Sequence, residues 1–260
     1  MARKLFSIFW IYLKECFAYP AASIIWVVAD AQTAMILPAV WMAAGSSFFG
    51  MTGNDIIGYY LVSMTLAQFI TCHLMWDIAW DIKEGFFSGQ IIRPVPYFGS
   101  QAARNLSWRV AKLALFAPVF VAVSLAYGLS SVPSIELNVT FIAATVLAHT
   151  LSYMLAFAMA MTAFWTVEFV SILRLYYLPE QFLSGRLVPL QSLPDWAATI
   201  ANALPFRWTN DFPVRLALGK VSEHEASVGL IIQVFWIVLS AVLCKVLFVR
   251  GTRHYSGVGM

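Results

Sequence analysis

Histidine, glutamate and serine side chains stand at two places where hydrolytic chemistry would need them. His224 and Glu225 form the first half of the zinc-protease pattern H-E-x-x-H, but Val228 stands where the second histidine is required. An intramembrane serine protease would need a nucleophile such as Ser47 with a base such as His149 within reach. Such combinations of residues are common by chance, so the sequence argues against a hydrolytic enzyme.

The sequence also lacks a complete phosphate-binding motif. The loop that cradles nucleotide phosphates has the pattern G-x-x-x-x-G-K-[ST]. The Gly219-Lys220 pair has Val214 and Val221 at the two positions that should be glycine and serine or threonine. We therefore expect no cofactor in this chain, and any ATP with its Mg²⁺ would be bound by a partner subunit.

Three ionisable residues lie inside apolar stretches, namely Asp30, Glu168 and Arg174. Inserting such a group at membrane depth costs about 2.5–3.5 kcal/mol, so these intramembrane polar residues are informative. One hypothesis is that Asp30 faces the bundle interior or a water-filled path, where it holds a cationic substrate or pairs with Arg174. The alternative is a polar contact that only joins two helices.

The composition indicates the elements that would position these residues. Of 260 residues, 61% are hydrophobic and 11% are charged, whereas about 25% of a soluble domain is charged. At about 20 apolar residues per crossing, the chain has room for about six membrane-spanning helices and no large soluble domain. The formal net charge of +3 is too small to argue for a nucleic-acid partner.

Long apolar runs predict an all-α polytopic membrane protein with six transmembrane helices in a single transmembrane domain, residues 1–260. The fifth run is weaker than the others because it contains Arg174 and Pro179. The six expected spans are approximately 21–46, 56–80, 110–129, 137–164, 167–184 and 228–249.

The distribution of Lys and Arg predicts the orientation, because cytoplasmic connections are rich in these residues. With both termini in the cytoplasm, the inner connections hold Arg3, Lys4, Lys14, Lys83, Arg93, Arg104, Arg109, Lys112, Lys245, Arg250 and Arg253. The outer connections then hold Arg186, Arg207, Arg215 and Lys220. The excess on the inner side favours cytoplasmic termini.

Residues 1–19 form an amphipathic pattern rather than a signal peptide. Lys14 and Glu15 interrupt the apolar run, and no small-residue cleavage site follows. On a helical wheel, Phe9 and Leu13 lie on the face opposite Lys14. We expect an interfacial helix that ends near Pro20, the alternative being an extension of the first span.

The connection 81–108 between the second and third spans is expected on the cytoplasmic side. Gly85 and Gly89 permit tight turns, and Phe86 and Phe87 are expected to be exposed. After Pro96 a short helix would carry Arg104 and Arg109. This pattern suggests a docking surface, although a plain connection between two helices is equally compatible with the composition.

The connection 185–227 between the fifth and sixth spans is expected on the outer side. Its 195–203 segment predicts a helix of about nine residues, about 14 Å long, which is too short to cross the membrane. We expect a re-entrant hairpin, the alternative being a surface loop. The residues that define it are Gly185, Pro189, Pro194, Trp196, Pro205, Phe206 and Pro213.

Three stretches together resemble the permease subunits of type 2 ATP-binding-cassette (ABC) exporters. They are the Glu84-Gly85 to Arg93-Pro94 loop, the run from Phe182-Leu183-Ser184-Gly185 through Leu193-Pro194-Asp195-Trp196, and the run from Leu204-Pro205-Phe206 through Pro213 to Gly219-Lys220. The order and spacing of these motifs carry the likeness, which covers nearly the whole chain.

The resemblance implies a half-transporter that exports a substrate from the cytoplasm. Separate ABC ATPase subunits would carry ATP and Mg²⁺, a second permease subunit, identical or homologous, would complete the pathway, and membrane lipids would surround both. The outer hairpin would form part of an external gate, and the membrane would be a bacterial inner membrane. The residues implied to contact the ATPase are Asp81, Lys83, Glu84, Gly85, Phe86, Gly89, Arg93 and Pro94.

Two other functions fit the same apolar chain. An ion-coupled secondary transporter would work alone and commonly shows an internal repeat, which we do not find between the two halves of the sequence. A membrane assembly protein would explain the apolar composition without transport.

Overall fold

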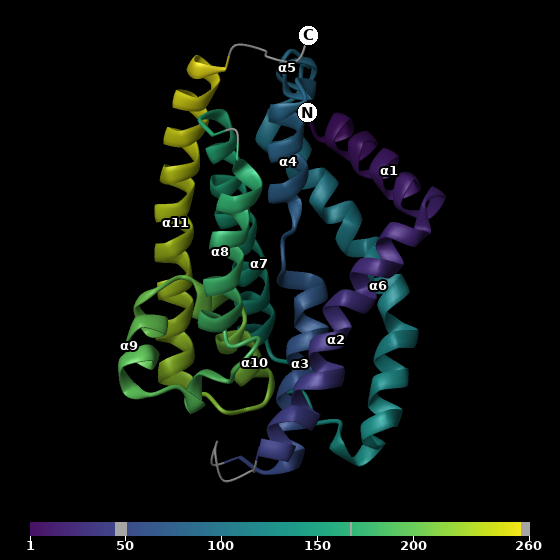
Figure 1. The fold of residues 1–260 in the computed structure, drawn as a ribbon, viewed down its shortest axis with the longest axis vertical. Coiled ribbons are helices and arrows are strands. Elements are labelled where there is room, and N and C mark those ends of the chain that lie inside the picture. Colours follow the sequence, from purple (N-terminus) through teal and green to yellow (C-terminus); the bar gives the residue numbers. More distant parts are fainter. Residues whose placement is uncertain (45–50, 167, 256–260) are drawn as a thin grey trace.

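The computed structural model describes residues 1–44, 51–166 and 168–255, and these residues form helices without strands. Long helices run roughly parallel along the longest axis, and α1 lies slanted against one end of the bundle (Figure 1). Short 3₁₀ helices complete the connections at Leu129–Ser131, Thr162–Phe164, Leu190–Ser192 and Phe206–Thr209.

The N-terminal helix α1, Ala2–Ala18, packs on α6, Tyr97–Tyr127. Leu13 and Cys16 are buried against Ala111, and the Ser107 hydroxyl donates to the carbonyl oxygen of Phe9 over 2.7 Å. The expected helix over residues 1–19 is confirmed. A separate helix, α2, Pro20–Ala44, then begins the first span.

The second span is interrupted near its middle. Helix α3, Gly53–Ile70, and helix α4, Leu74–Lys83, are separated by Thr71, Cys72 and His73, which are not helical. Figure 1 shows the chain drawn out between the two helices. The sequence prediction of one continuous helix over 56–80 missed this interruption.

The third span starts earlier than predicted. After α5, Phe86–Ile91, helix α6 runs without interruption from Tyr97 to Tyr127, so it includes Arg104, Arg109 and Lys112. The expected short separate helix after Pro96 is therefore wrong. Arg109 and Lys112 are buried, at 7% and 2% exposure, and do not belong to a cytoplasmic loop.

Three further helices complete the bundle: α7, Val139–Met161, α8, Phe169–Leu183, and α11, Glu223–His254. Side chains fix where two of them begin. The Asn138 side chain accepts the Phe141 backbone N–H over 2.8 Å, and Ser222 and Glu225 form a capping box at the start of α11.

Two short helices lie between α8 and α11 at the end of the bundle opposite α5 (Figure 1). They are α9, Asp195–Ala203, and α10, Asp211–Ala217. The predicted nine-residue helix over 195–203 is confirmed, since α9 has those bounds.

Within the described residues, five helical stretches are long and apolar enough to cross a membrane, and they lie at Ser23–Ala43, Gly53–Lys83, Tyr97–Tyr127, Val139–Phe164 and Glu223–His254. The expected fifth of six spans corresponds to α8, whose 15 residues extend about 22 Å. This length is below the roughly 30 Å of a bilayer core. The N-terminus and the end of α11 nevertheless lie at the same end of the bundle, with α8 running back along it (Figure 1).

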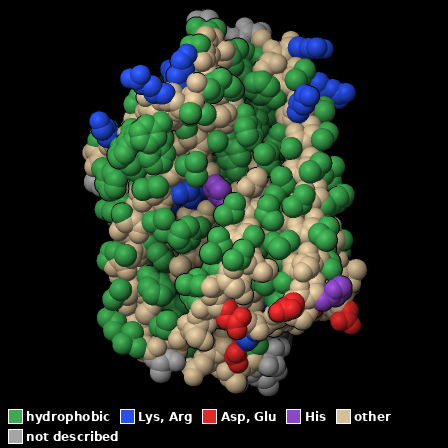
Figure 2. All heavy atoms as spheres, turned by 180° about the vertical axis from the view of Figure 1, so that it is seen from behind, with side chains coloured by type: hydrophobic (Ala, Val, Ile, Leu, Met, Phe, Trp, Pro, Cys, Tyr) green, Lys and Arg blue, Asp and Glu red, His purple; other side chains and the backbone are tan. Residues whose placement is uncertain are grey.

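Basic and acidic side chains lie mostly at opposite ends of the bundle. On the face shown in Figure 2, Lys and Arg side chains gather at one end and most Asp and Glu side chains at the other, with hydrophobic side chains between them. Arg250 and Arg253 belong to the last turns of α11 and Glu223 and Glu225 to its first turn. A hydrophobic band between two charged ends is the surface expected of a membrane-spanning bundle.

Candidate functional site

The α5 helix is attached to α4 by a turn that depends on one glycine. Gly85 has a φ of +82°, a left-handed conformation that side chains other than glycine rarely adopt. The Glu84 backbone N–H donates to the Trp80 carbonyl oxygen over 2.9 Å, which ends α4. The chain therefore reverses sharply and presents α5 across the end of the bundle.

One side of α5 is anchored by Phe87, which is fully buried. Its ring contacts those of Tyr97 at 5.0 Å, Phe164 at 5.1 Å and Tyr255 at 5.1 Å between centroids, all edge to face. These rings come from the start of α6, the end of the fourth span and the end of α11. The prediction that Phe87 is exposed is wrong, because the aromatic side chains around it form a socket.

A polar network holds the same region from the other side. Arg104 lies 3.4 Å from the Asp77 carboxylate and 3.5 Å from that of Asp81, and its guanidinium is 5.1 Å from the centre of the Tyr12 ring. Gln90 donates to Asp81 over 2.8 Å. The network joins α1, α4, α5 and α6.

The opposite side of α5 is exposed. Phe86 is 67% exposed and Ile92 is 82% exposed, although both are large apolar side chains. Glu84, Gly89, Arg93 and Pro94 are also exposed, whereas Asp81 and Lys83 are half-buried. We call the exposed set Glu84, Phe86, Gly89, Ile92 and Arg93 the α5 surface. It combines apolar contact area with one charge of each sign.

A second polar site lies at the interruption between α3 and α4. Arg109 Nη1 donates to the Gln68 carbonyl oxygen over 3.0 Å, and His149 Nδ1 lies 3.4 Å from the Ile70 carbonyl oxygen. The Cys72 backbone N–H donates to the Ser152 hydroxyl oxygen over 3.1 Å. Side chains of α6 and α7 therefore satisfy backbone groups that the interrupted helix leaves open.

A cavity of about 90 Å³ with several polar residues in its wall adjoins this interruption. Asn105, Arg109 and Lys112 of α6 contribute to its wall, as do His73 and Asp77. Figure 2 shows basic and histidine side chains in a hollow midway along an otherwise hydrophobic face. The sequence analysis missed this site, although the spacing 105, 109 and 112 places the three α6 residues on one helical face.

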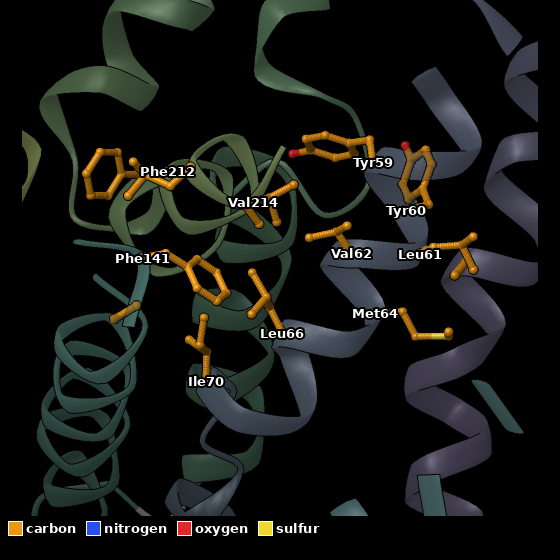
Figure 3. Packing of buried hydrophobic residues seen from close by; sticks show 14 of the residues in the cluster. Tyr59, Tyr60, Leu61, Val62, Met64, Leu66, Ile70, Phe141, Phe212 and Val214 are labelled. Carbon is orange, nitrogen blue, oxygen red and sulfur yellow. The ribbon is translucent and has the colours of Figure 1, made fainter. Parts of the chain in front are cut away.

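Three side chains of α3 form hydrogen bonds with the predicted hairpin. Tyr59 donates to the Gly185 carbonyl oxygen over 2.9 Å, and Tyr60 donates to that of Leu187 over 2.8 Å. Ser63 donates to Asn210 over 3.1 Å. Figure 3 shows Tyr59 and Tyr60 on α3, with Phe212 and Val214 of α10 packed nearby in the same buried cluster.

The predicted hairpin residues divide into a buried base and an exposed tip. Gly185, with a φ of +84°, Pro189, Pro205 and Pro213 are buried, and Phe206 is half-buried. Pro194 precedes α9, on which Trp196 is 71% exposed. The α9 part of the hairpin is therefore free to contact another surface.

Asp211 is a buried acidic residue of the hairpin. It is 1% exposed, and its Oδ2 lies 3.4 Å from Arg207 Nε. Burial raises the pKa of Asp211, and the nearby Arg207 and Arg215 guanidinium groups oppose this rise.

The structure describes the side chains of two of the three predicted intramembrane polar residues. Asp30 lies in α2, but its side chain is outside the described residues, as is Ser47. Glu168 is exposed and precedes α8, and Arg174 is exposed on α8. Within the described ranges, no group of three His, Cys, Asp or Glu side chains is placed to hold a metal ion.

The part of the chain that the structure describes is helical and contains five helices fit by length and composition to cross a membrane, which defines a polytopic membrane protein. The family model described as "ABC-2 family transporter protein" matches residues 27–259, and the chain belongs to this family. It is a permease of an ABC transporter, which confirms the resemblance found in the sequence. Searches of curated proteins and of solved structures gave no match.

Proposed function

We propose that this chain is the membrane half of an exporter that moves a substrate out of the cytoplasm with ATP hydrolysed by a separate subunit. The observation that carries the proposal is the α5 helix, which exposes Phe86 and Ile92 while Phe87 fixes its other side in the bundle. Exposed apolar side chains with a polar rim are typical of a protein-binding surface. The partner that fits is an ABC ATPase subunit, which would carry ATP and Mg²⁺.

The anchoring of α5 supports a mechanical role. A movement of the ATPase subunit would act on α5, and the Phe87 socket and the Arg104 network would pass it to α1, α4, α6 and α11. The α3 helix continues from α4 to the outer hairpin through the Tyr59 and Tyr60 hydrogen bonds. In this proposal the hairpin is the outer gate and α3 with α4 is the connection to it.

A second permease subunit, identical or homologous, completes the pathway in this proposal. Helix α8 supports it, because Leu175, Leu178 and Phe182 on its surface are 75%, 61% and 43% exposed beside Arg174. A short helix with a charged residue is better accommodated against another protein chain than against lipid. With α8 as the sixth crossing, both termini are cytoplasmic in a bacterial inner membrane.

The test is co-purification of the full chain with its ABC ATPase subunit. We expect Arg93→Glu and Glu84→Lys to abolish co-purification, because both reverse a charge on the α5 surface. Glu223→Lys is the matched control, since Glu223 is also exposed but lies in the first turn of α11, at the other end of the bundle. Transport by the chain alone, driven by an ion gradient in liposomes, would contradict the proposal.

A further inference from the structure

A large apolar groove runs between α6 and α11 near the α5 end of the bundle, with α7 as its floor. Its volume is about 470 Å³. The rings of Phe98 and Phe157 lie 5.1 Å apart and those of Phe157 and Phe248 lie 6.3 Å apart. The Tyr153 hydroxyl donates to the Phe98 carbonyl oxygen over 2.8 Å. The floor is therefore held by ring contacts and a hydrogen bond, and its shape is already formed.

The walls of the groove belong to membrane spans. Met154 lies on α7 and Ala241 and Phe248 lie on α11, within the stretches Val139–Phe164 and Glu223–His254. A groove between such spans favours hydrocarbon over water, because its lining is almost entirely apolar, with Lys245 as its charged residue. The occupant available there is a lipid acyl chain.

The basic residues near the groove determine which lipid headgroup is favoured there. Lys245 lines the groove and is exposed, and Arg250 and Arg253 follow it towards the end of α11. Helices α6 and α7 contain no Asp or Glu, and the only acidic residues of α11, Glu223 and Glu225, stand at its far end. The charged side chain that lines the groove is therefore positive, which favours a negatively charged headgroup.

A second groove provides a comparison within the same chain. It lies between α2 and α6, has a volume of about 510 Å³, and is lined by Met35, Pro118, Ala122 and neighbouring residues without a charged side chain. Its size and apolar character match those of the first groove. The first groove has the charged side chain of Lys245 in its lining, and the second groove has no charged side chain there.

We propose that the α6–α7–α11 groove binds one acyl chain of an anionic glycerophospholipid, with the lipid phosphate placed by Lys245. Arg250 and Arg253 add to the positive potential at that end of α11. The α2–α6 groove accepts acyl chains without preference for the headgroup. This inference depends on the membrane spans and not on the proposed transport function.

The experiment uses the full chain in vesicles of phosphatidylcholine and phosphatidylglycerol that carry a photoactivatable acyl chain. Cross-linked peptides are then identified by mass spectrometry for each headgroup separately. We expect peptides from the α6–α7–α11 groove to cross-link about fivefold more with phosphatidylglycerol than with phosphatidylcholine, since one basic residue near the surface supplies roughly that factor. Peptides from the α2–α6 groove should show no such preference.

Variants separate the contributions of charge and shape. Lys245→Gln should remove the preference in the first groove, and Lys245→Arg should retain it. Ala241→Trp, which fills the groove, should remove cross-linking with both headgroups there, whereas Ala122→Trp should do so only in the second groove. Thermal unfolding confirms that each variant is folded. Equal cross-linking of both headgroups to the wild-type groove, or an unchanged preference in Lys245→Gln, would overturn the proposal.

Discussion

Arg109 donates through Nη1 to the carbonyl oxygen of Gln68, three residues before the interruption of the second span. The carbonyl belongs to the last turn of α3, where the helix has no following N–H groups to offer. A buried cation on α6 therefore supplies the donor that the interrupted helix lacks.

We expect Arg109→Met to lower the free energy of unfolding by roughly 1.5–3 kcal/mol, the range for a hydrogen bond to a charged group. Thermal unfolding of the purified chain in detergent measures this loss. Arg174→Met is the control, because Arg174 is exposed and has no hydrogen bond or ion pair among the described residues. Unfolding at the same temperature for both variants would show that the Gln68 carbonyl finds another donor.

Phe87 and Phe86 are neighbours with opposite environments, and replacing each should have a different effect. Phe87→Ala removes a fully buried ring and should cost about 3–5 kcal/mol of stability. Phe86→Ala removes a ring that is 67% exposed and should leave stability nearly unchanged while weakening co-purification with the ATPase subunit. The two measurements, thermal unfolding and co-purification, should therefore separate the variants. A stable Phe87→Ala variant would contradict the socket.

Gly185 should not tolerate a side chain. Its φ of +84° costs roughly 1–2 kcal/mol for an L-residue, and a Cβ atom there would lie 2.6 Å from the Tyr59 hydroxyl oxygen. We expect Gly185→Ala to lower the unfolding temperature and to disturb the Tyr59 hydrogen bond. Gly89→Ala is the matched control, because nothing lies within 4 Å of its Cβ position. Equal stability of the two variants would mean that the hairpin base relaxes without cost.

The cysteines allow the orientation to be tested in the otherwise unchanged chain. Cys16, Cys72 and Cys244 are all buried, and burial raises the pKa of the Cys16 thiol to about 11. Because the thiolate is the reactive form, little of Cys16 reacts at neutral pH. We expect the wild-type chain to react slowly with a membrane-impermeant maleimide.

New cysteines at the two ends then report the side of the membrane. Gly89→Cys lies on the α5 surface and Asp195→Cys on the exposed part of the hairpin. In intact cells only Asp195→Cys should be labelled, and in inverted vesicles only Gly89→Cys. Labelling of both from one side would rule out α8 as a crossing.

The sequence predicted the elements whose signals are local. The N-terminal helix α1 ends before Pro20, and α9 is limited by Pro194 and Pro205, so both helices were recognised with nearly correct bounds. The turn at Gly85 and the base at Gly185 were also singled out from residue type, and both have positive φ.

The elements that were missed depend on partners distant in sequence. The charges of Arg104, Arg109 and Lys112 suggested a loop, because a sequence window does not show that Asp77, Asp81 and the open carbonyls of α3 lie beside them. The burial of Phe87 was missed for the same reason. Tyr255, one of the rings that surround it, lies 168 positions further along the chain. A hydropathy value counts the free-energy cost of burying these charged side chains, but it does not include the ion pairs and hydrogen bonds that offset this cost in the folded chain.

The burial of the Phe87 ring among aromatic side chains also has a consequence for the assembly of the permease with a partner subunit. A six-residue helix is not stable alone in water, so α5 has its shape only when its socket exists. Tyr255 and Phe248, which help to form that socket, lie at the end of α11, far beyond α5 in the sequence. A subunit that recognises the α5 surface therefore recognises a chain in which α11 is already packed, and docking becomes a checkpoint for that packing.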